Sequence, residues 1–436
     1  MIRALIVSCL LFIGVSAHAA VDIVEVTSPG GIDAWLVEEH SIPFVALEIR
    51  IRGGAALDDP AKRGATNLMV ALLEEGAADM DARAFQAARE SLAASYSFNV
   101  YDDTFSVSAL MLTENRTEAL ALLRTALIEP RFDEDAIERV RAQVLSIIAS
   151  DAKDPDAIAS DALNAAAFAG HPYGSSMNGT VESVAALTRD DLLAAYRNVL
   201  TRDRLYVSAV GDITADELGV LLDELLGDLP AEGPPLPDRV EFGLPGGTTV
   251  IDFPTPQSVA IFGHQGIARD DEDFYAAFIL NHILGGGGFE SRLMQEVREA
   301  RGLTYGIGTY LVPKDHAEMV LGSVASSNET MAEAITVVRE IWAQTAAAGV
   351  TAEELEAAKT YITGEYPLRF DGNAEIAQIM VGMQMIDLPP EYVINRNDYI
   401  DAVTLEHINR VAAELLLPEA LHFVVVGQPV GMDAGQ

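Results

Sequence analysis

Four consecutive glycines, Gly285, Gly286, Gly287 and Gly288, stand directly before the densest cluster of arginine and glutamate in the chain. Backbone amides ahead of a helix can attract an anion such as phosphate. This stretch has neither the Gly-Lys-Ser/Thr ending of a P-loop nor the spacing of a dinucleotide-binding fingerprint, which disfavours a nucleotide ligand. A glycine run is equally typical of a loop that bends sharply or that another backbone passes closely.

The charged residues after the glycines predict a helix over 291–301, followed by a strand whose start includes Tyr305. On this helix Arg298 and Arg301 are neighbours three positions apart, whereas Arg292 diverges from them. A tyrosine at a strand start is most often half-buried. Judged by spacing alone, a surface face tied together by Glu–Arg pairs is as well supported as a functional site.

Other catalytic centres have no local support in the sequence. No two histidines lie three or four positions apart on a predicted helix, and the motif His-x-x-Glu-His and calcium-type acidic loops are absent. A metal site assembled from distant histidines stays an alternative of low weight. The chain has no Gly-x-Ser-x-Gly motif, and its single cysteine is Cys9, so no nucleophile is evident in the later sequence.

Charge and the first residues indicate the compartment and exclude some partners. A net charge of −38 disfavours nucleic acid and anionic lipid, which are polyanions. Residues 1–19 begin with a positive charge, continue as an apolar run and end in Ala-His-Ala, which predicts a cleaved signal peptide. The alternative, a membrane anchor, is disfavoured because the apolar run is too short to span a bilayer. We therefore expect a secreted, periplasmic protein without stable membrane association.

A segment rich in proline and glycine, residues 227–240, predicts a linker that divides the chain almost in the middle. The expected domains are residues 20–226 and residues 241–436. The ends of the two domains align without a gap over 186–213 and 402–429. Such similarity over one long segment predicts a duplicated domain rather than a solenoid.

The aligned ends share a pattern of helix and strand. Thr188 precedes Gly211 by 23 positions, and Thr404 precedes Gly427 by the same 23. In both copies the threonine stands where a helix N-cap is expected, and an apolar strand ends at the glycine.

Hydrophobic periodicity predicts similar elements in both halves and an α+β sandwich fold, in which helices cover an antiparallel sheet. The expected strands are 34–40, 44–54, two strands within 96–112 that meet at Asp102-Asp103, 258–266 and 318–326, and the expected helices include 64–76, 81–94 and 273–284.

Together these segments resemble the pitrilysin/insulysin-like (insulinase) family of zinc metallopeptidases, which includes the mitochondrial processing peptidases and two-chain bacterial relatives. The resemblance covers nearly the whole mature chain. It is carried by residues 62–77, 171–179 and 284–307 and by the duplicated domain ends. It implies two homologous α+β sandwich domains that form half of a clamshell around a peptide.

The resemblance also implies that this chain has lost the family's zinc motif. The positions that match His-x-x-Glu-His are residues 67–71, where Asn67, Val70 and Ala71 replace the two histidines and the catalytic glutamate. These side chains can neither bind zinc in the usual way nor serve as base for a metal-bound water. We expect a structural helix with Leu68, Ala71 and Leu72 packed inward.

A second functional element of the family is an arginine and a tyrosine seven residues apart, which Arg298 and Tyr305 match. The resemblance implies that Tyr305 donates a hydrogen bond to the oxyanion of the reacting carbonyl and that Arg298 binds substrate carbonyls or a carboxylate. The glycines at 285–288 would then form a flexible turn that contacts the peptide substrate.

In the two-chain bacterial relatives, one subunit carries the zinc motif and the other carries the Arg/Tyr pair. This chain looks like the second kind, with no cofactor of its own and with zinc in a paralogous partner subunit. It would be inactive alone and hydrolyse peptides only as part of a heterodimer. The alternatives are a non-catalytic scaffold or peptide-capture protein of the same fold, and a stand-alone enzyme with an unrecognised site.

Overall fold

The structure is a computed structural model that describes residues 22–432 of the chain. The predicted signal peptide, residues 1–19, lies outside the described residues. Within them, no helix has both the length and the apolar character that crossing a membrane requires.

The first half of the chain is built on a six-stranded sheet in the order β1-β2-β8-β3-β7-β6. All neighbours in this sheet are antiparallel except β2 and β8, which run parallel. The predicted sheet was wholly antiparallel, but the chain returns from β7 through several helices and enters between β2 and β3. The strands are β1 (Val24–Thr27), β2 (Asp33–Glu38), β3 (Phe44–Arg52), β6 (Ser95–Val100), β7 (Thr104–Leu112) and β8 (Leu205–Gly211).

The second half repeats this sheet with five strands in the order β11-β12-β10-β13-β9. Its single parallel pair, β13 with β9, corresponds to β8 with β2 in the first half. The two sheets thus match strand for strand apart from β1, as the predicted duplication requires. The strands are β9 (Gly247–Asp252), β10 (Gln257–Gln265), β11 (Ile307–Pro313), β12 (Glu318–Ser327) and β13 (His422–Gly427).

Both halves use the same cap and the same glycine at the aligned ends. Thr188 and Thr404 cap their helices by accepting a hydrogen bond from the backbone three residues on. Gly211 and Gly427 have φ values of 139° and 152°, and a Cβ atom on either would overlap the neighbouring strand. Only glycine fits where each strand ends, so the repeated interval has a structural cause.

Helices cover the two sheets and close a hydrophobic core in each half. In the first half they are α1 (Ala65–Ala71), α2 (Ala82–Ser91), α3 (Arg116–Ile128), α4 (Glu134–Asp151), α6 (Val181–Ala186), α7 (Arg189–Val199) and α8 (Ala215–Leu226), with a small pair of strands, β4 (Gly76–Ala77) and β5 (Met80–Asp81). In the second half they are α9 (Phe274–Asn281), α10 (Met331–Ala348), α11 (Ala352–Glu365), α13 (Tyr392–Asp401) and α14 (Leu405–Leu415).

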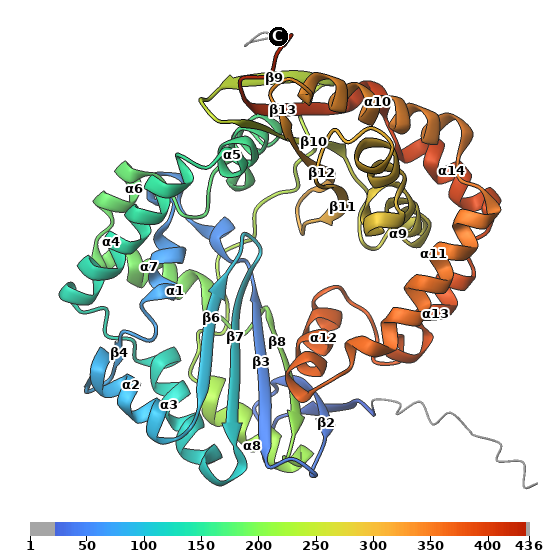
Figure 1. Cartoon of the computed structure of the whole chain (residues 1–436). Coiled ribbons are helices and arrows are strands. Elements are labelled where there is room, and N and C mark those ends of the chain that lie inside the picture. Colours follow the sequence, from blue (N-terminus) through green and yellow to red (C-terminus); the bar gives the residue numbers. More distant parts are fainter. Residues whose placement is uncertain (1–21, 433–436) are drawn as a thin grey trace, which may run out of the picture.

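Two further helices, α5 (Pro155–Ala167) and α12 (Asn373–Met385), each pack on the sheet of the other half (Figure 1). The α5 helix lies on β10 and β13, where Leu163 is buried against Val424 and Val426. The α12 helix lies on β3 and β8, and the Ser208 hydroxyl donates a hydrogen bond of 2.6 Å to the Ala377 carbonyl. We call α5 and α12 the exchanged helices.

Residues 227–246, between the two sheets in sequence, form neither helix nor strand. Polar contacts also join the halves where the β6–β7 and β11–β12 turns meet. Lys314 pairs with Asp102 at 2.6 Å, and the hydroxyl of Tyr173 accepts a hydrogen bond from the His316 amide at 3.1 Å. The halves are therefore connected by side chains as well as by the backbone.

Candidate functional site

The helix that matches the zinc motif, α1, is short and carries no ligand set. Val70 is buried, and the Asn67 amide donates a hydrogen bond of 3.0 Å to the side-chain oxygen of Asn178. Leu68 and Leu72 are buried as predicted, but Ala71 is exposed, so its predicted inward packing is wrong. The helix ends at Ala71, four positions after Asn67 on the face away from the core.

A zinc ion does not fit these residues. Val70 and Ala71 have no ligand atoms, and the Asn67 amide is engaged with Asn178. One helical turn further on, Glu74 is paired with Arg89 at 2.6 Å. Across residues 22–432, no three His, Cys, Asp or Glu side chains are placed to hold a metal ion. The described residues of this helix therefore do not form a zinc ligand set.

The glycine run lies in two short helical turns, and its predicted flexibility stays a prediction. The chain continues from α9 into a π-helical turn, His282–Gly286, and then a 3₁₀ turn, Gly288–Glu290. Gly285 is buried, and a Cβ atom there would overlap the Thr309 hydroxyl on β11. Close packing against β11 therefore requires the glycine. Gly286 and Gly288 are exposed, and substrate contact by the run stays a prediction.

The helix predicted over 291–301 winds as a π-helix over Met294–Glu299. The predicted Glu–Arg pairs are present, but they serve different purposes. Arg301 pairs with Glu296 on the same segment. Arg292 makes two hydrogen bonds of 2.7 Å to Glu354 at the start of α11, which anchors the segment to the helix layer.

The Arg292–Glu354 pair predicts a pH-dependent part of the stability. Hydrogen bonds from Arg292 lower the pKa of Glu354 to about 2, from 4.5 for the free group. The stabilisation is therefore complete above pH 4.5 and is lost as the pH falls from 4.5 towards 2. Glu354→Gln should lower the free energy of unfolding by about 1 kcal/mol at pH 7. Urea unfolding curves should show this difference shrinking below pH 4.5.

Glu353→Gln is the matched control, because Glu353 is an exposed residue in the first turn of the same helix. We expect a change within about 0.5 kcal/mol for this variant. A Glu354→Gln difference that stays constant down to pH 3 would contradict the role of the ion pair.

Arg298 lies over the ring of Phe289, with its guanidinium carbon 4.6 Å from the ring centroid. Its Nε atom is 3.4 Å from a carboxylate oxygen of Glu299. Phe289 is more than half exposed although it is a large apolar residue. Stacking on an aromatic ring orients a guanidinium without using its hydrogen-bond donors. Sequence analysis did not identify Phe289, although its place directly after the glycine run was visible.

Tyr305 stands on a short turn before β11, which begins at Ile307, four residues after the predicted start at Leu303. The Thr304 hydroxyl fixes this turn by donating to the Ala325 carbonyl at 2.6 Å and accepting from the Gly306 amide at 3.0 Å. The Tyr305 side chain is 84% exposed, so the expected half-buried packing is wrong. Among the described residues its hydroxyl has no hydrogen-bond partner. The turn holds a phenol outward on a fixed backbone.

Arg298 and Tyr305 belong to one locally bonded unit. The Arg298 carbonyl accepts a hydrogen bond from Gly302 at 2.8 Å, and the Leu303 amide donates to Val297 at 2.9 Å. This unit packs on α10 and β11 in the second half, whereas α1 packs on α7, α4 and β6 in the first. The structure therefore places Arg298 and Tyr305 on one segment of the second half, whereas α1 lies in the first half.

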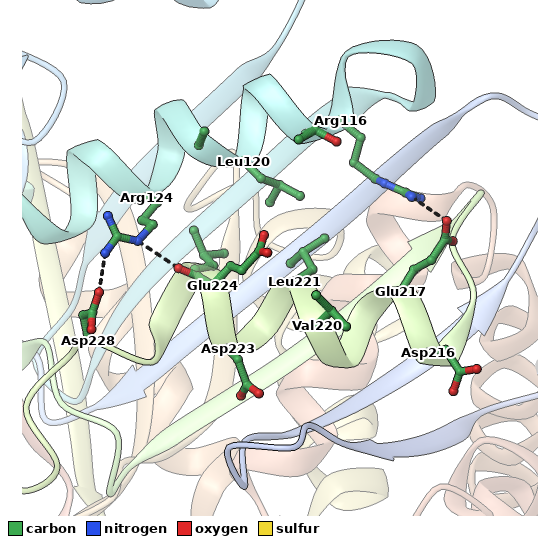
Figure 2. A pocket seen from close by; sticks show the side chains of 13 residues that line it. Arg116, Leu120, Arg124, Asp216, Glu217, Val220, Leu221, Asp223, Glu224 and Asp228 are labelled. Atoms are coloured by element: carbon green, nitrogen blue, oxygen red, sulfur yellow. Dashed lines mark hydrogen bonds and ion pairs between the residues drawn. The ribbon is translucent and has the colours of Figure 1, made fainter.

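A groove of about 790 Å³ between α3 and α8 is an alternative location for a functional site (Figure 2). It is lined by Leu120, Val220 and Leu221 and flanked by Arg116–Glu217 and Arg124–Asp228 ion pairs. These pairs hold the two helices together, and none of the predicted site residues lines the groove. Packing of α3 against α8 explains both the apolar lining and the ion pairs of this groove.

Comparison with known proteins shows similarity along most of the chain. Residues 34–181 match the family model described as insulinase (peptidase family M16), and residues 186–362 match the one described as peptidase M16 inactive domain. Together the two models span both halves.

Two curated relatives show the same similarity. The chain is 26% identical to a Helicobacter pylori protein named non-peptidase homolog YmxG, over 85% of this chain and 86% of that one. It is 25% identical to a Bacillus subtilis protein named uncharacterized zinc protease YmxG, over 89% of this chain and 94% of that one.

Solved structures agree on the fold. A peptidase M16 inactive domain from Pseudomonas fluorescens superposes with a TM-score of 0.87 at 25% identity, covering 95% of this chain and 99% of that one. A protease from Helicobacter pylori superposes with a TM-score of 0.84 at 15% identity, over 93% and 99% of the two chains. The second likeness concerns the fold alone.

Proposed function

The chain belongs to the insulinase family (peptidase M16), and from this premise we propose that it is the zinc-free, Arg/Tyr subunit of a heterodimeric peptidase. Residues 186–362 match the family model described as peptidase M16 inactive domain, and α1 in the described structure carries no set of metal ligands. In the proposed complex, a paralogous partner holds zinc and this chain supplies Arg298 and Tyr305.

The observation that carries the proposal is the presentation of Tyr305. A phenol that is 84% exposed gains little from packing, yet the Thr304 hydroxyl holds its backbone in one conformation. Such an arrangement is expected where a hydrogen-bond donor must meet an acceptor on another molecule, because positioning in advance avoids the cost of ordering it later.

Each residue of the unit has a defined part in the proposed reaction. Tyr305 donates a hydrogen bond to the carbonyl oxygen of the substrate as negative charge develops on it. Arg298, oriented by its stacking on Phe289, binds a substrate carbonyl or carboxylate.

The proposed setting is the periplasm, reached through the signal peptide predicted at residues 1–19, and the proposed substrates are unfolded peptides. A non-catalytic scaffold or peptide-capture protein is the second candidate. The printed name of the Helicobacter pylori relative, non-peptidase homolog, favours it. The two candidates differ in whether Tyr305 contributes to turnover.

Reconstitution tests the proposal. The chain would be mixed with a paralogue from the same organism that carries His-x-x-Glu-His, and cleavage of a quenched fluorescent peptide would be followed with and without a chelator. We expect either protein alone to cleave almost none of the peptide. The mixture should cleave it, and a chelator should abolish that cleavage. A paralogue equally active without this chain, or a 1:1 complex without added activity, would contradict the catalytic role.

A further inference from the structure

A second cavity, of about 670 Å³, lies in the C-terminal half and is lined by residues of α9, β11, α12 and α13 among others. Its wall includes Gly286 of the glycine run and Thr309 to Leu311 of β11, the strand that follows Tyr305. Three arginines and four tyrosines line it, so we call it the arginine–tyrosine pocket. They are Arg269, Arg369, Arg396, Tyr275, Tyr310, Tyr366 and Tyr392.

The charge of this pocket is opposite to that of the protein. The chain has 66 acidic and 28 basic residues, yet no Asp or Glu lines the pocket. Arg369 is compensated by Glu365 at 2.7 Å. For Arg269 and Arg396, no carboxylate oxygen of the described residues lies within ion-pair distance. The pocket therefore keeps two positive charges without a counter-charge.

Arg396 is the more buried of these two arginines, with only 5% of its surface exposed. It donates to the Ile362 carbonyl at 2.9 Å and lies 4.6 Å from the centroid of the Tyr366 ring. Arg269 lies over the ring of Phe274 at 4.3 Å, and Tyr275 and Tyr392 offer it only distant hydroxyl oxygens at 3.5 Å. Aromatic stacking holds both guanidinium groups but does not neutralise them.

Three buried polar atoms of the lining residues also lack partners among the described residues. They are the Thr309 hydroxyl, the Tyr366 hydroxyl and the side-chain oxygen of Asn281. Thr309 is 1% exposed and Tyr366 is 9% exposed. Burial raises the pKa of Tyr366, so its hydroxyl stays protonated as a donor. Unpaired buried polar groups are costly and rare, and these three atoms make the wall of the cavity more polar than its apolar lining alone.

Apolar surface makes up the rest of the pocket. Phe278, Leu311, Ile379 and Ile386 line it together with the aromatic rings. A cavity of this size accommodates a ligand of about two amino-acid residues, with one polar end and one apolar body.

We propose that the arginine–tyrosine pocket binds a carboxylate carried on an apolar or aromatic group, with the carboxylate at Arg269 and Arg396. The C-terminal residue of a peptide and a free fatty acid share this chemistry. Identifying the ligand as a peptide end rests on the proposed function; the carboxylate site itself does not. Carboxylate binding by paired guanidinium groups is charge-assisted and therefore discriminates strongly against a neutral amide.

Calorimetric titration of this chain alone tests the inference. The probes are N-acetyl-Leu-Phe with a free carboxylate, the same dipeptide as its amide, and decanoate. We expect the free acid to bind at least about 10-fold more tightly than the amide. Tighter binding of decanoate than of the dipeptide would identify a fatty acid as the source and support the site. Equal binding of acid and amide, or no binding of any probe, would overturn it.

Substitutions of lining residues test whether the carboxylate binds in the arginine–tyrosine pocket. Arg269→Gln should weaken acid binding about 10-fold and change amide binding less than 2-fold. Ile386→Trp should abolish both, since Ile386 lines the cavity and is exposed enough to tolerate a larger ring. Arg124→Gln, on the outer surface beside α8, is the matched control and should change nothing. An unchanged affinity in Arg269→Gln would exclude the assigned carboxylate position.

These measurements need no partner subunit. Carboxylate binding without trans-activation of a paralogue would leave the pocket established and the proposed function refuted. Activation of a paralogue without carboxylate binding would refute only the carboxylate site in the pocket.

Discussion

Tyr305→Phe should lower the turnover of the reconstituted complex by about 100-fold or more, the scale for losing one oxyanion donor. The variant removes only the phenolic hydroxyl, which has no hydrogen-bond partner among the described residues. Because the side chain is 84% exposed, folding should be unaffected. Initial rates of peptide cleavage at saturating partner concentration measure the effect, and kcat should fall more than the affinity for substrate.

Tyr361→Phe is the control for this result. Tyr361 is also an exposed tyrosine of the second half. It lies on α11, and its ring stacks on His282. It should leave turnover within 2-fold of the unmodified chain. Size-exclusion chromatography of each mixture establishes that the complex still forms. Full turnover by Tyr305→Phe in an intact complex would refute the catalytic assignment and favour a scaffold.

Arg63→Met should cause a large loss of stability, about 3 kcal/mol in the free energy of unfolding. Arg63 is 5% exposed and pairs with Asp102 at 3.0 Å. It also donates to the carbonyl oxygens of Pro172 and Ser175 at 3.2 and 3.0 Å. Methionine fills similar space but removes the donor to the Ser175 carbonyl and one cation beside Asp102, whereas the Pro172 carbonyl still accepts from the Ser175 amide. Lys314 still compensates Asp102, which keeps the loss below that of an isolated buried charge.

Urea unfolding followed by circular dichroism measures this loss as a lower transition midpoint. Arg124→Met is the matched control, because its ion pair with Asp228 lies at the surface, and it should cost less than about 0.5 kcal/mol. If both variants lose the same stability, Arg63 does not act as the junction of residues 171–175 with the β6–β7 turn.

Sequence predicted those parts of the fold that depend on local backbone chemistry. The intervals from Thr188 to Gly211 and from Thr404 to Gly427 reflect a cap and a glycine that each half needs at the same place. The absence of histidine and glutamate at positions 67, 70 and 71 was equally readable, since it depends on residue types alone.

Features set by distant partners could not be predicted. Arg292 was one of three similar arginines until the structure paired it with Glu354, 62 positions away. The two π-helical turns both pack on β11, a contact that spacing does not reveal. The exposure of Tyr305 depends on bonds from Thr304 to Ala325 in another strand.

The arginine–tyrosine pocket illustrates the same limit. Its arginines and tyrosines come from the loop before α9, from α9, from β11, from the turn after α11 and from α13, so no local pattern joins them. An unpaired arginine looks like any other in the sequence. Only the placement of Arg269 and Arg396 away from every carboxylate of the described residues distinguishes them.

The exchanged helices also bear on how the protein is made. The first sheet is synthesised about 160 residues before α12. In the complete protein α12 covers three residues of that sheet, Trp35, Ala46 and Val210. These side chains therefore stay exposed until α12 has been made. The second sheet has no such delay, because α5 exists before β10 and β13 emerge. Chaperone demand should therefore fall on the N-terminal half during synthesis, and completion of that half awaits nearly the last tenth of the chain.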